Sequence, residues 1–352
     1  MSTATQQALI IPSPKAPFVI GPRPIPVPAK GQVRLKLLSV GLNPLNSVQH
    51  EFDVFISEYP AVIGADFAGV VDEVGEDVVG FSKGDEVFGQ ALNGGFQQYT
   101  TVPTAILIRK PKNITFDDAA SFPATFPTAC VGLFAQAPIG LALNPSFSWD
   151  RPQQGESALV IGGGTSTGQF AVQLLKFLGF TRIVVYASKV HFYYLKQLGA
   201  TECIDRADVP LEKLVVKPPV KVVYDATFTG ALDAAYDSVV DGGKVTTVRP
   251  EAKTERDPRS ITLVHCFGFY VGPDVMEPIG DPAHWHASVE HTIFGKRIIE
   301  ELPKMVEHGV IVPNRIEVLP NGLAGIPDAL ERMKAGGVRG VKVIAHPQES
   351  AP

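Results

Sequence analysis

One glycine-rich segment limits the possible folds of this chain more than any other: residues 159–168, with the sequence LVIGGGTSTG. An apolar run enters the glycines, and residues 169–179 continue with the apolar spacing of an amphipathic helix. A strand that passes through such a turn into a helix brings a pyrophosphate to the helix N-terminus, where backbone N–H groups and the helix dipole hold negative charge. Gly162, Gly164 and Gly168 have the spacing GxGxxxG, one residue longer than the usual dinucleotide fingerprint. The loop therefore indicates a dinucleotide site only together with its context.

The bulk composition sets limits on the architecture and on the partners. A chain of 352 residues is longer than a typical single core, so we expect two domains. The net charge of -5, without a block of Lys or Arg, argues against nucleic acid and against a membrane partner. The start of the chain has no leader pattern, and the cysteines are widely separated: Cys130, Cys203 and Cys266. Both features favour a reducing, cytoplasmic location over a disulfide framework.

The hydrophobic pattern changes along the chain. Residues 1–120 contain alternating, turn-rich strand patterns, of which residues 31–40 are the clearest. From residue 157 onward strands alternate with helices, which predicts a parallel, doubly wound sheet. We therefore predict an α/β fold with a Rossmann domain over residues 121–280. Residues 1–120 and the returning tail 281–352 would together form a β-rich domain.

Several motifs of the β-rich part resemble those of the medium-chain dehydrogenase/reductase family. Residues 41–44, GLNP, are similar to the LNP segment of its zinc-free quinone and enoyl reductases, and residues 60–75 resemble its substrate-domain signature. The KGDEVF sequence of residues 83–88 is similar to its GDxV turn. The resemblance covers nearly the whole chain and is nearest to the trans-acting enoyl reductases of fungal polyketide and toxin pathways. It implies a GroES-like substrate domain beside an NADP-binding Rossmann domain.

The residues that hold zinc in this family's alcohol dehydrogenases have no counterpart in the sequence. Catalytic zinc needs a Cys, a His and a second Cys that converge tetrahedrally. By resemblance the first Cys position falls near Asn43 and the His position is Ala65, and residues 85–115 lack the cysteines of the structural zinc lobe. The clustered tail histidines have no known ligand spacing and are expected on the surface: His284, His286 and His291. We therefore expect no metal and no simple alcohol oxidation.

The cofactor is expected to be NADP(H). NAD-binding Rossmann domains carry an Asp or Glu at the end of the second strand, which binds the ribose 2′-hydroxyl. Ser188 and Lys189 stand at that position in this chain, and a hydroxyl and a cation suit a 2′-phosphate. Arg206 follows the next strand, where it would stack on adenine or pair with the phosphate. The alternative is that Lys189 and Arg206 are ordinary surface cations.

The resemblance implies further contacts with the cofactor. The hydroxyl residues of the glycine loop would bind the pyrophosphate, although they also suit a helix cap. Tyr270 would hold the nicotinamide carboxamide through its backbone, although it also suits core packing. The set implied in this way is Asn43, Gly164, Thr165, Ser166, Thr167, Tyr270, Val271, Val338 and Arg339.

The implied reaction is hydride transfer from NADPH to the β-carbon of an α,β-unsaturated carbonyl, either an enoyl thioester or an enal or enone, followed by protonation of the α-carbon. By resemblance Thr128 lies near the nicotinamide and the substrate; as an alternative it caps a helix. The Tyr or Lys that relatives often place after Asn-Pro is replaced by Val48. Asn46 and His50 are the nearest candidates for a protein acid, and solvent is the alternative.

Two other functions fit the same residues. A quinone oxidoreductase would share the cofactor and the zinc-free site, and a non-catalytic NADPH-binding protein would share the scaffold without the reaction. The substrate of the expected reductase is a small molecule or a group bound to a carrier protein. The resemblance to the fungal enzymes makes a polyketide synthase a candidate partner.

Overall fold

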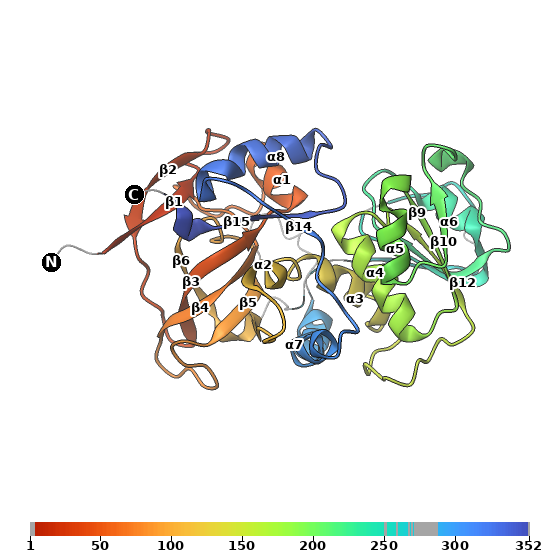
Figure 1. The fold of residues 1–352 in the computed structure, drawn as a ribbon, viewed down its shortest axis with the longest axis horizontal. Coiled ribbons are helices and arrows are strands. Elements are labelled where there is room, and N and C mark those ends of the chain that lie inside the picture. Colours follow the sequence, from red (N-terminus) through yellow and green to blue (C-terminus); the bar gives the residue numbers. More distant parts are fainter. Residues whose placement is uncertain are drawn as a thin grey trace.

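The computed structural model describes residues 4–249, 252–257, 260–266, 268, 270 and 288–350. Two sheets stand at opposite ends of an elongated molecule, with helices between them (Figure 1). The predicted α/β architecture, a parallel Rossmann sheet beside a β-rich half, is confirmed. The α-helices are α1 (Pro44–Phe52), α2 (Phe116–Ala119), α3 (Thr125–Phe134), α4 (Ser166–Leu178), α5 (Phe192–Leu198), α6 (Leu232–Ser238), α7 (Val289–Glu307) and α8 (Ile326–Lys334). None of the helices within the described ranges is long and apolar enough to cross a bilayer.

Among the described residues, six strands form the Rossmann sheet: β8 (Ser157–Ile161), β9 (Arg182–Ala187), β10 (Glu202–Asp205), β11 (Val220–Asp225), β12 (Val239–Thr247) and β13 (Thr262–His265). Their order is β10-β9-β8-β11-β12-β13, and the neighbouring strands are parallel. This is the order of a dinucleotide-binding sheet, in which the chain changes direction across the sheet beside β8. The glycine-rich segment leaves the sheet at this switch point.

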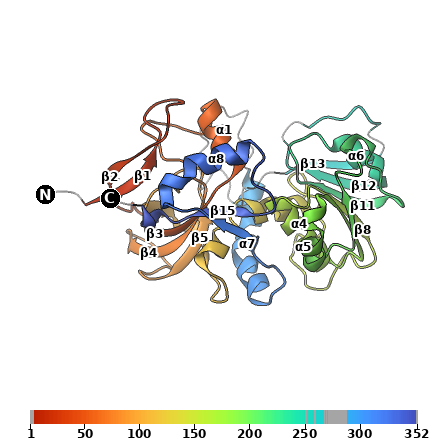
Figure 2. The same ribbon diagram turned by 45° about the horizontal axis from the view of Figure 1, so that its top comes forward.

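Helices cover both faces of the Rossmann sheet (Figure 2). Ala158 and Val160 of β8 belong to a core that includes apolar residues of α4 and α5. Leu159 and Ile161 belong to a second core that includes residues of α6. Successive side chains of a strand point to opposite faces, so the uninterrupted apolar run of β8 reflects burial on both sides.

The second sheet contains β3 (Gln32–Gly41), β4 (Asp66–Val74), β5 (Glu86–Gln90), β6 (Tyr99–Pro103), β7 (Leu107–Arg109), β14 (Ile316–Val318) and β15 (Lys342–Ala345). Val33 and Leu35 are fully buried in β3, as the alternating pattern predicts. Gly41, at the end of β3, lies opposite Ile344 of β15 on one side and opposite Asp66 of β4 on the other. The tail therefore returns to the N-terminal sheet and closes it beside β3.

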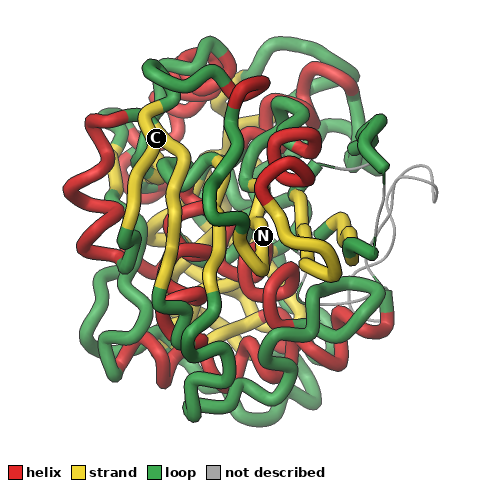
Figure 3. The backbone as a smooth tube through the Cα atoms, turned by 90° about the vertical axis from the view of Figure 1, so that its right-hand side faces the viewer, coloured by secondary structure: helices red, strands yellow, loops and turns green. Residues whose placement is uncertain are grey.

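Two helices join the halves. Helix α3 packs against α4 and β12 of the Rossmann half, and α7 packs against both α3 and β7. Strands β1 (Thr5–Ile10) and β2 (Val19–Pro24) form a separate antiparallel pair at the outer end, and α1 and α8 lie side by side. Seen down the long axis, the strands of the two sheets overlap near the centre of the view, and helices lie on several sides of them (Figure 3).

Candidate functional site

The glycine-rich segment forms a closed turn between β8 and α4. Gly162 has a φ of 78°, in the left-handed region that favours glycine. A Cβ on Gly168 would overlap the carbonyl oxygen of Gly162 and would lie 2.8 Å from the Cα of Gly163, so only glycine lets α4 start this close to the turn. The Oγ1 of Thr165 caps α4 by accepting the Gly168 N–H at 3.0 Å. This strand, turn and helix start have the form that cradles a pyrophosphate.

The cations expected for a 2′-phosphate follow two neighbouring strands. Ser188 and Lys189 come directly after β9, and the side chain of Lys189 is exposed. Arg206 comes directly after β10, and its backbone N–H donates to the carbonyl of Ala187 at 3.1 Å. The carboxylate of Asp205 accepts a hydrogen bond from the N–H of Ala207 at 3.0 Å, so it stabilises the turn that follows β10. The structure thus brings Ser188 and the two cations to one edge of the sheet.

A histidine and an arginine that sequence reasoning missed lie at the same edge. His191 is buried, and its Nδ1 accepts a hydrogen bond from Nη2 of Arg315 at 3.2 Å. Because arginine only donates, the Nδ1 of His191 must carry a lone pair. Burial lowers the pKa of His191, and the positive charges of Arg315, Arg206 and Arg339 lower it further. His191 is therefore neutral at physiological pH, and its ring is held by Arg315.

Buried amides connect the tail to the glycine loop. The Nε2 of Gln169 in α4 donates to the carbonyls of Gly164 at 3.1 Å and Gly340 at 3.3 Å. The Nδ2 of Asn314 donates to Oε1 of Gln169 at 3.0 Å and to the Ser166 carbonyl at 3.2 Å. The expected tail residues Val338 and Arg339 directly precede Gly340 and so lie beside this contact. Gln169 and Gln173 are both buried and lie one turn apart in α4, and two such amides on one buried helix face are the signal that could have revealed this connection.

A buried charged cluster occupies the β-rich half. The Nζ of Lys342 lies 2.7 Å from Oδ2 of Asp66 and 2.6 Å from Oδ1 of Asn43, and Nδ2 of Asn43 donates to the same Asp66 oxygen at 2.9 Å. The side chains of Lys342 and Asp66 are 3% and 0% exposed. Gly41 leaves room for this cluster, since a Cβ there would lie 2.9 Å from Cε of Lys342. The Oδ1 of Asp66 is buried and has no hydrogen-bond partner within the described part of the chain.

The two candidate acids do not share a site. Asn46 is fully buried, its Oδ1 accepts the N–H of Asn43 at 2.8 Å, and it completes the capping box of α1. His50 faces the N-terminal segment instead: its Nε2 lies 2.8 Å from the carbonyl oxygen of Ala16, and its ring packs 4.4 Å from that of Phe18. Asn46 is thus held as a helix cap, and His50 packs against a different segment.

Thr128 and Tyr270 lie where the two halves meet. Thr128 is inside α3, so the alternative that it caps a helix is wrong; its Oγ1 donates to the Ala124 carbonyl at 2.6 Å. A Cβ on Gly268 would overlap this Oγ1, which places Thr128 beside the segment that follows β13. The Tyr270 hydroxyl donates to the Ile106 carbonyl at 2.7 Å, and burial raises its pKa. The Tyr270 side chain therefore packs in the core, and Val271 lies outside the described residues.

No group of three metal-binding side chains occurs among the residues that the structure describes. Of the tail histidines, His284 and His286 lie outside those residues, and His291 is buried rather than exposed. The Nδ1 of His291 accepts the Ser288 N–H at 3.1 Å and so caps α7. Burial lowers the pKa of His291 to about 4, which makes it a neutral cap.

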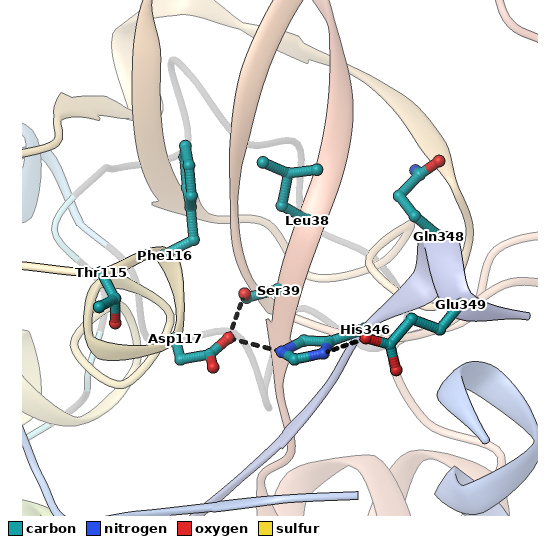
Figure 4. A pocket seen from close by; sticks show the side chains of 8 residues that line it. All are labelled: Leu38, Ser39, Thr115, Phe116, Asp117, His346, Gln348 and Glu349. Atoms are coloured by element: carbon teal, nitrogen blue, oxygen red, sulfur yellow. Dashed lines mark hydrogen bonds and ion pairs between the residues drawn. The ribbon is translucent and has the colours of Figure 1, made fainter. Parts of the chain in front are cut away.

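A hollow of about 340 Å³ lies on the β-rich half, and residues of β3, α2 and the C-terminal turn line it (Figure 4). Asp117 at its base accepts hydrogen bonds from Ser39 at 2.5 Å and from His346 Nε2 at 2.8 Å. The Nδ1 of His346 lies 2.9 Å from Glu349. Ser39 contacts the carboxylate and not the imidazole, so this is not a nucleophile with its base. The network instead ties the C-terminal turn to α2.

The network makes part of the stability depend on pH. Burial opposes protonation of His346, but the hydrogen bonds and charges of Asp117 and Glu349 outweigh it, and the pKa of His346 is raised. The resulting stability is therefore complete below the unfolded pKa and is lost as the pH rises through the folded one. We expect His346→Gln to lower the free energy of unfolding by less than about 1 kcal/mol at about pH 5.5 and to leave it unchanged at about pH 8.5. Urea unfolding of both proteins at the two pH values measures this difference. An equal cost at both pH values would contradict this.

Comparisons with known proteins agree with this architecture. Residues 29–112 match the model of the alcohol dehydrogenase GroES-like domain. The trans-enoyl reductase tazE of Aspergillus terreus is 32% identical over 270 residues, which cover 73% of this chain and 87% of that protein. A zinc-type alcohol dehydrogenase-like protein of Schizosaccharomyces pombe is 30% identical over 348 residues, which cover 93% of this chain and 95% of that protein.

Solved structures share the fold over nearly the whole chain. An alcohol dehydrogenase superfamily protein from Novosphingobium aromaticivorans has a TM-score of 0.76 at 25% identity, and the match covers 97% of this chain and 99% of that one. A quinone oxidoreductase from Coxiella burnetii has a TM-score of 0.74 at 22% identity, with the same coverage of 97% and 99%. Proteins with different names thus share one arrangement of a Rossmann half and a GroES-like half.

Proposed function

Because the chain belongs to the medium-chain dehydrogenase/reductase family, we propose that it is an NADPH-dependent, zinc-free reductase of carbon–carbon double bonds conjugated to a carbonyl. The observation that carries the cofactor assignment is the edge formed by Ser188, Lys189 and Arg206 beside the glycine loop, where no acid follows β9. The names of several relatives, trans-enoyl reductases, support the choice of substrate class.

The residues at the family's zinc position do not fit the metal. Asn43 and Ala65 stand where Cys and His ligands are needed, and a methyl group cannot ligate. The neighbouring Asp66 and Asn43 are already bound by the ammonium group of Lys342. A dication placed among these groups would be repelled by that buried positive charge. The proposed reaction therefore uses no zinc ion.

The chain's own residues would bind and orient the reactants. NADPH, when bound, supplies the hydride. The glycine turn and the first N–H groups of α4 would hold its pyrophosphate, and Thr165 fixes the start of that helix. Thr128, beside the segment after β13, would stand next to the nicotinamide and the unsaturated carbonyl.

Water is the proposed source of the proton for the α-carbon, because Asn46 is used as a cap and His50 packs against another segment. We expect His50→Ala to leave the turnover number within about twofold of wild type across the pH range. The measurement is a pH profile of NADPH oxidation for both proteins. Loss of an ionisation near neutrality in the variant would assign the proton donor to His50 instead.

A substrate panel tests the proposed function directly. NADPH oxidation would be followed with enoyl thioesters, short enals and enones, and quinones, with NADH run in parallel. We expect turnover of the conjugated carbonyls with NADPH, and carrier-bound enoyl thioesters as the best substrates if a polyketide synthase is the partner. Oxidation with quinones alone would replace the proposal by a quinone oxidoreductase. Tight NADPH binding without any oxidation would indicate a non-catalytic binding protein.

A further inference from the structure

An arginine of the returning tail lies against the nucleotide-binding half. Arg315 directly precedes β14 of the GroES-like sheet, yet its guanidinium contacts residues that follow β9 of the Rossmann sheet. Its Nη2 donates to His191 Nδ1 at 3.2 Å, and its Cζ lies 4.3 Å from the ring centre of Tyr194 in α5. These two contacts fix the plane of the guanidinium while leaving most of its N–H donors available.

The same contacts place Arg315 beside the expected 2′-phosphate position. The backbone N–H of His191 donates to the carbonyl of Ser188 at 3.0 Å, so the imidazole that holds Arg315 belongs to the turn that carries Ser188. A Cβ on Gly164 of the glycine loop would lie 2.9 Å from Cδ2 of His191. A Cβ on Gly340 would lie 2.9 Å from Nη2 of Arg315. The tail, the glycine loop and the end of β9 therefore meet around one imidazole.

Positive charge collects at this meeting point. Among the described residues, no carboxylate lies within ion-pair distance of the four cations Lys189, Arg206, Arg315 and Arg339. Arg315 contacts the His191 ring directly, Arg206 follows the strand next to β9, and Arg339 directly precedes Gly340. Unpaired like charges repel one another in the folded protein, and an anion between them would relieve that repulsion. The arrangement is thus suited to a dianionic group.

We propose that Arg315 is a specificity-determining residue that binds the 2′-phosphate of NADPH from the tail, in addition to Lys189 and Arg206. The proposal rests on the proposed function, in which the cofactor is NADPH. A planar guanidinium forms paired hydrogen bonds with phosphate oxygens, which an ammonium group cannot do. Because Asn314 and Gln169 join this segment to the glycine loop, the 2′-phosphate would also hold the tail against the Rossmann half.

The experiment uses nucleotide fragments, so that it does not depend on turnover. Binding of 2′,5′-ADP and of 5′-AMP would be measured by calorimetry for the wild type, Arg315→Ala and Arg315→Lys. We expect Arg315→Ala to weaken 2′,5′-ADP about tenfold to a hundredfold and to leave 5′-AMP unchanged, since it removes a charged hydrogen bond to phosphate. Arg315→Lys should restore part of the affinity. Arg332→Ala is the matched control, because Arg332 is a tail arginine that pairs with Glu317.

The outcomes separate this proposal from the proposed function. If the wild type prefers 2′,5′-ADP and Arg315→Ala keeps the full preference, Arg315 does not bind the phosphate, while the NADPH assignment stands. If the wild type binds both fragments equally, the NADPH assignment is wrong, and the proposed role of Arg315 is then wrong as well. If Arg315→Ala loses both fragments alike, the residue has only a structural role, and the proposal is overturned.

Discussion

Replacing Lys342 by methionine is expected to lower the free energy of unfolding by about 3–5 kcal/mol, because it leaves the carboxylate of Asp66 buried without a counter-charge. Asp66 is 0% exposed, and its Oδ1 already lacks a partner within the described residues. Asn43 would be the carboxylate's remaining donor, through Nδ2 at 2.9 Å. Urea unfolding monitored by circular dichroism measures the change.

Two further variants test the cause of that loss. Lys334→Met makes the same substitution at an exposed lysine paired with Glu331, where we expect no measurable change in the free energy of unfolding. The double variant Lys342→Met/Asp66→Asn removes both buried charges, and we expect it to be more stable than Lys342→Met alone. If the single variant costs as little as Lys334→Met, or the double variant is less stable than Lys342→Met alone, the buried pair does not have the role assigned to it.

Replacing Gly168 by alanine is expected to distort the turn that we propose as the pyrophosphate site. The new Cβ would overlap the carbonyl oxygen of Gly162 and approach the Cα of Gly163 to 2.8 Å, and both contacts are with backbone that a side-chain rotation cannot relieve. The turn must move away from α4, so we expect about 1–3 kcal/mol of destabilisation and at least about a tenfold loss of NADPH affinity. Fluorescence titration with NADPH and urea unfolding measure the two effects.

The matched control for this change is Gly21→Ala in β2. A Cβ on Gly21 meets only Cδ1 of Ile10, at an ordinary 3.6 Å, so this variant should bind NADPH like the wild type. An affinity of Gly168→Ala equal to that of Gly21→Ala would mean that the turn is not the cofactor cradle. A loss of stability in Gly168→Ala with unchanged affinity would also count against the cradle.

Local features of the fold could be predicted because they depend on neighbouring residues. The alternation in residues 31–40 gives one buried face, and Val33 and Leu35 are fully buried in β3. The apolar run before Gly162 predicts a strand covered on both sides, which β8 is. The amphipathic pattern of residues 288–308 likewise predicts a helix, and α7 spans Val289–Glu307.

The candidate site was only partly predictable. The place of the glycine turn, Ser188 and Arg206 at one edge of the sheet could be predicted, because each follows a strand of a parallel sheet; their binding of the cofactor stays a prediction. His291 could not, since the pattern that placed it on the surface does not show that its ring caps α7. His50 is near Asn46 in sequence, but its ring packs against Phe18 and contacts the carbonyl of Ala16 instead. This contact depends on a distant segment, which the local pattern does not show.

By itself the sequence determined the alternating strand patterns and the strand, turn and helix of the glycine-rich segment, because these follow from periodicity and from glycine at close backbone approaches. Only the tertiary structure decided which distant residues become partners. Lys342 and Asp66 are 276 positions apart and meet because β15 and β4 flank β3. Arg315 and His191 are 124 positions apart and meet because the tail folds back over the glycine loop. Such contacts depend on strand order and on buried hydrogen bonds, which no local pattern encodes.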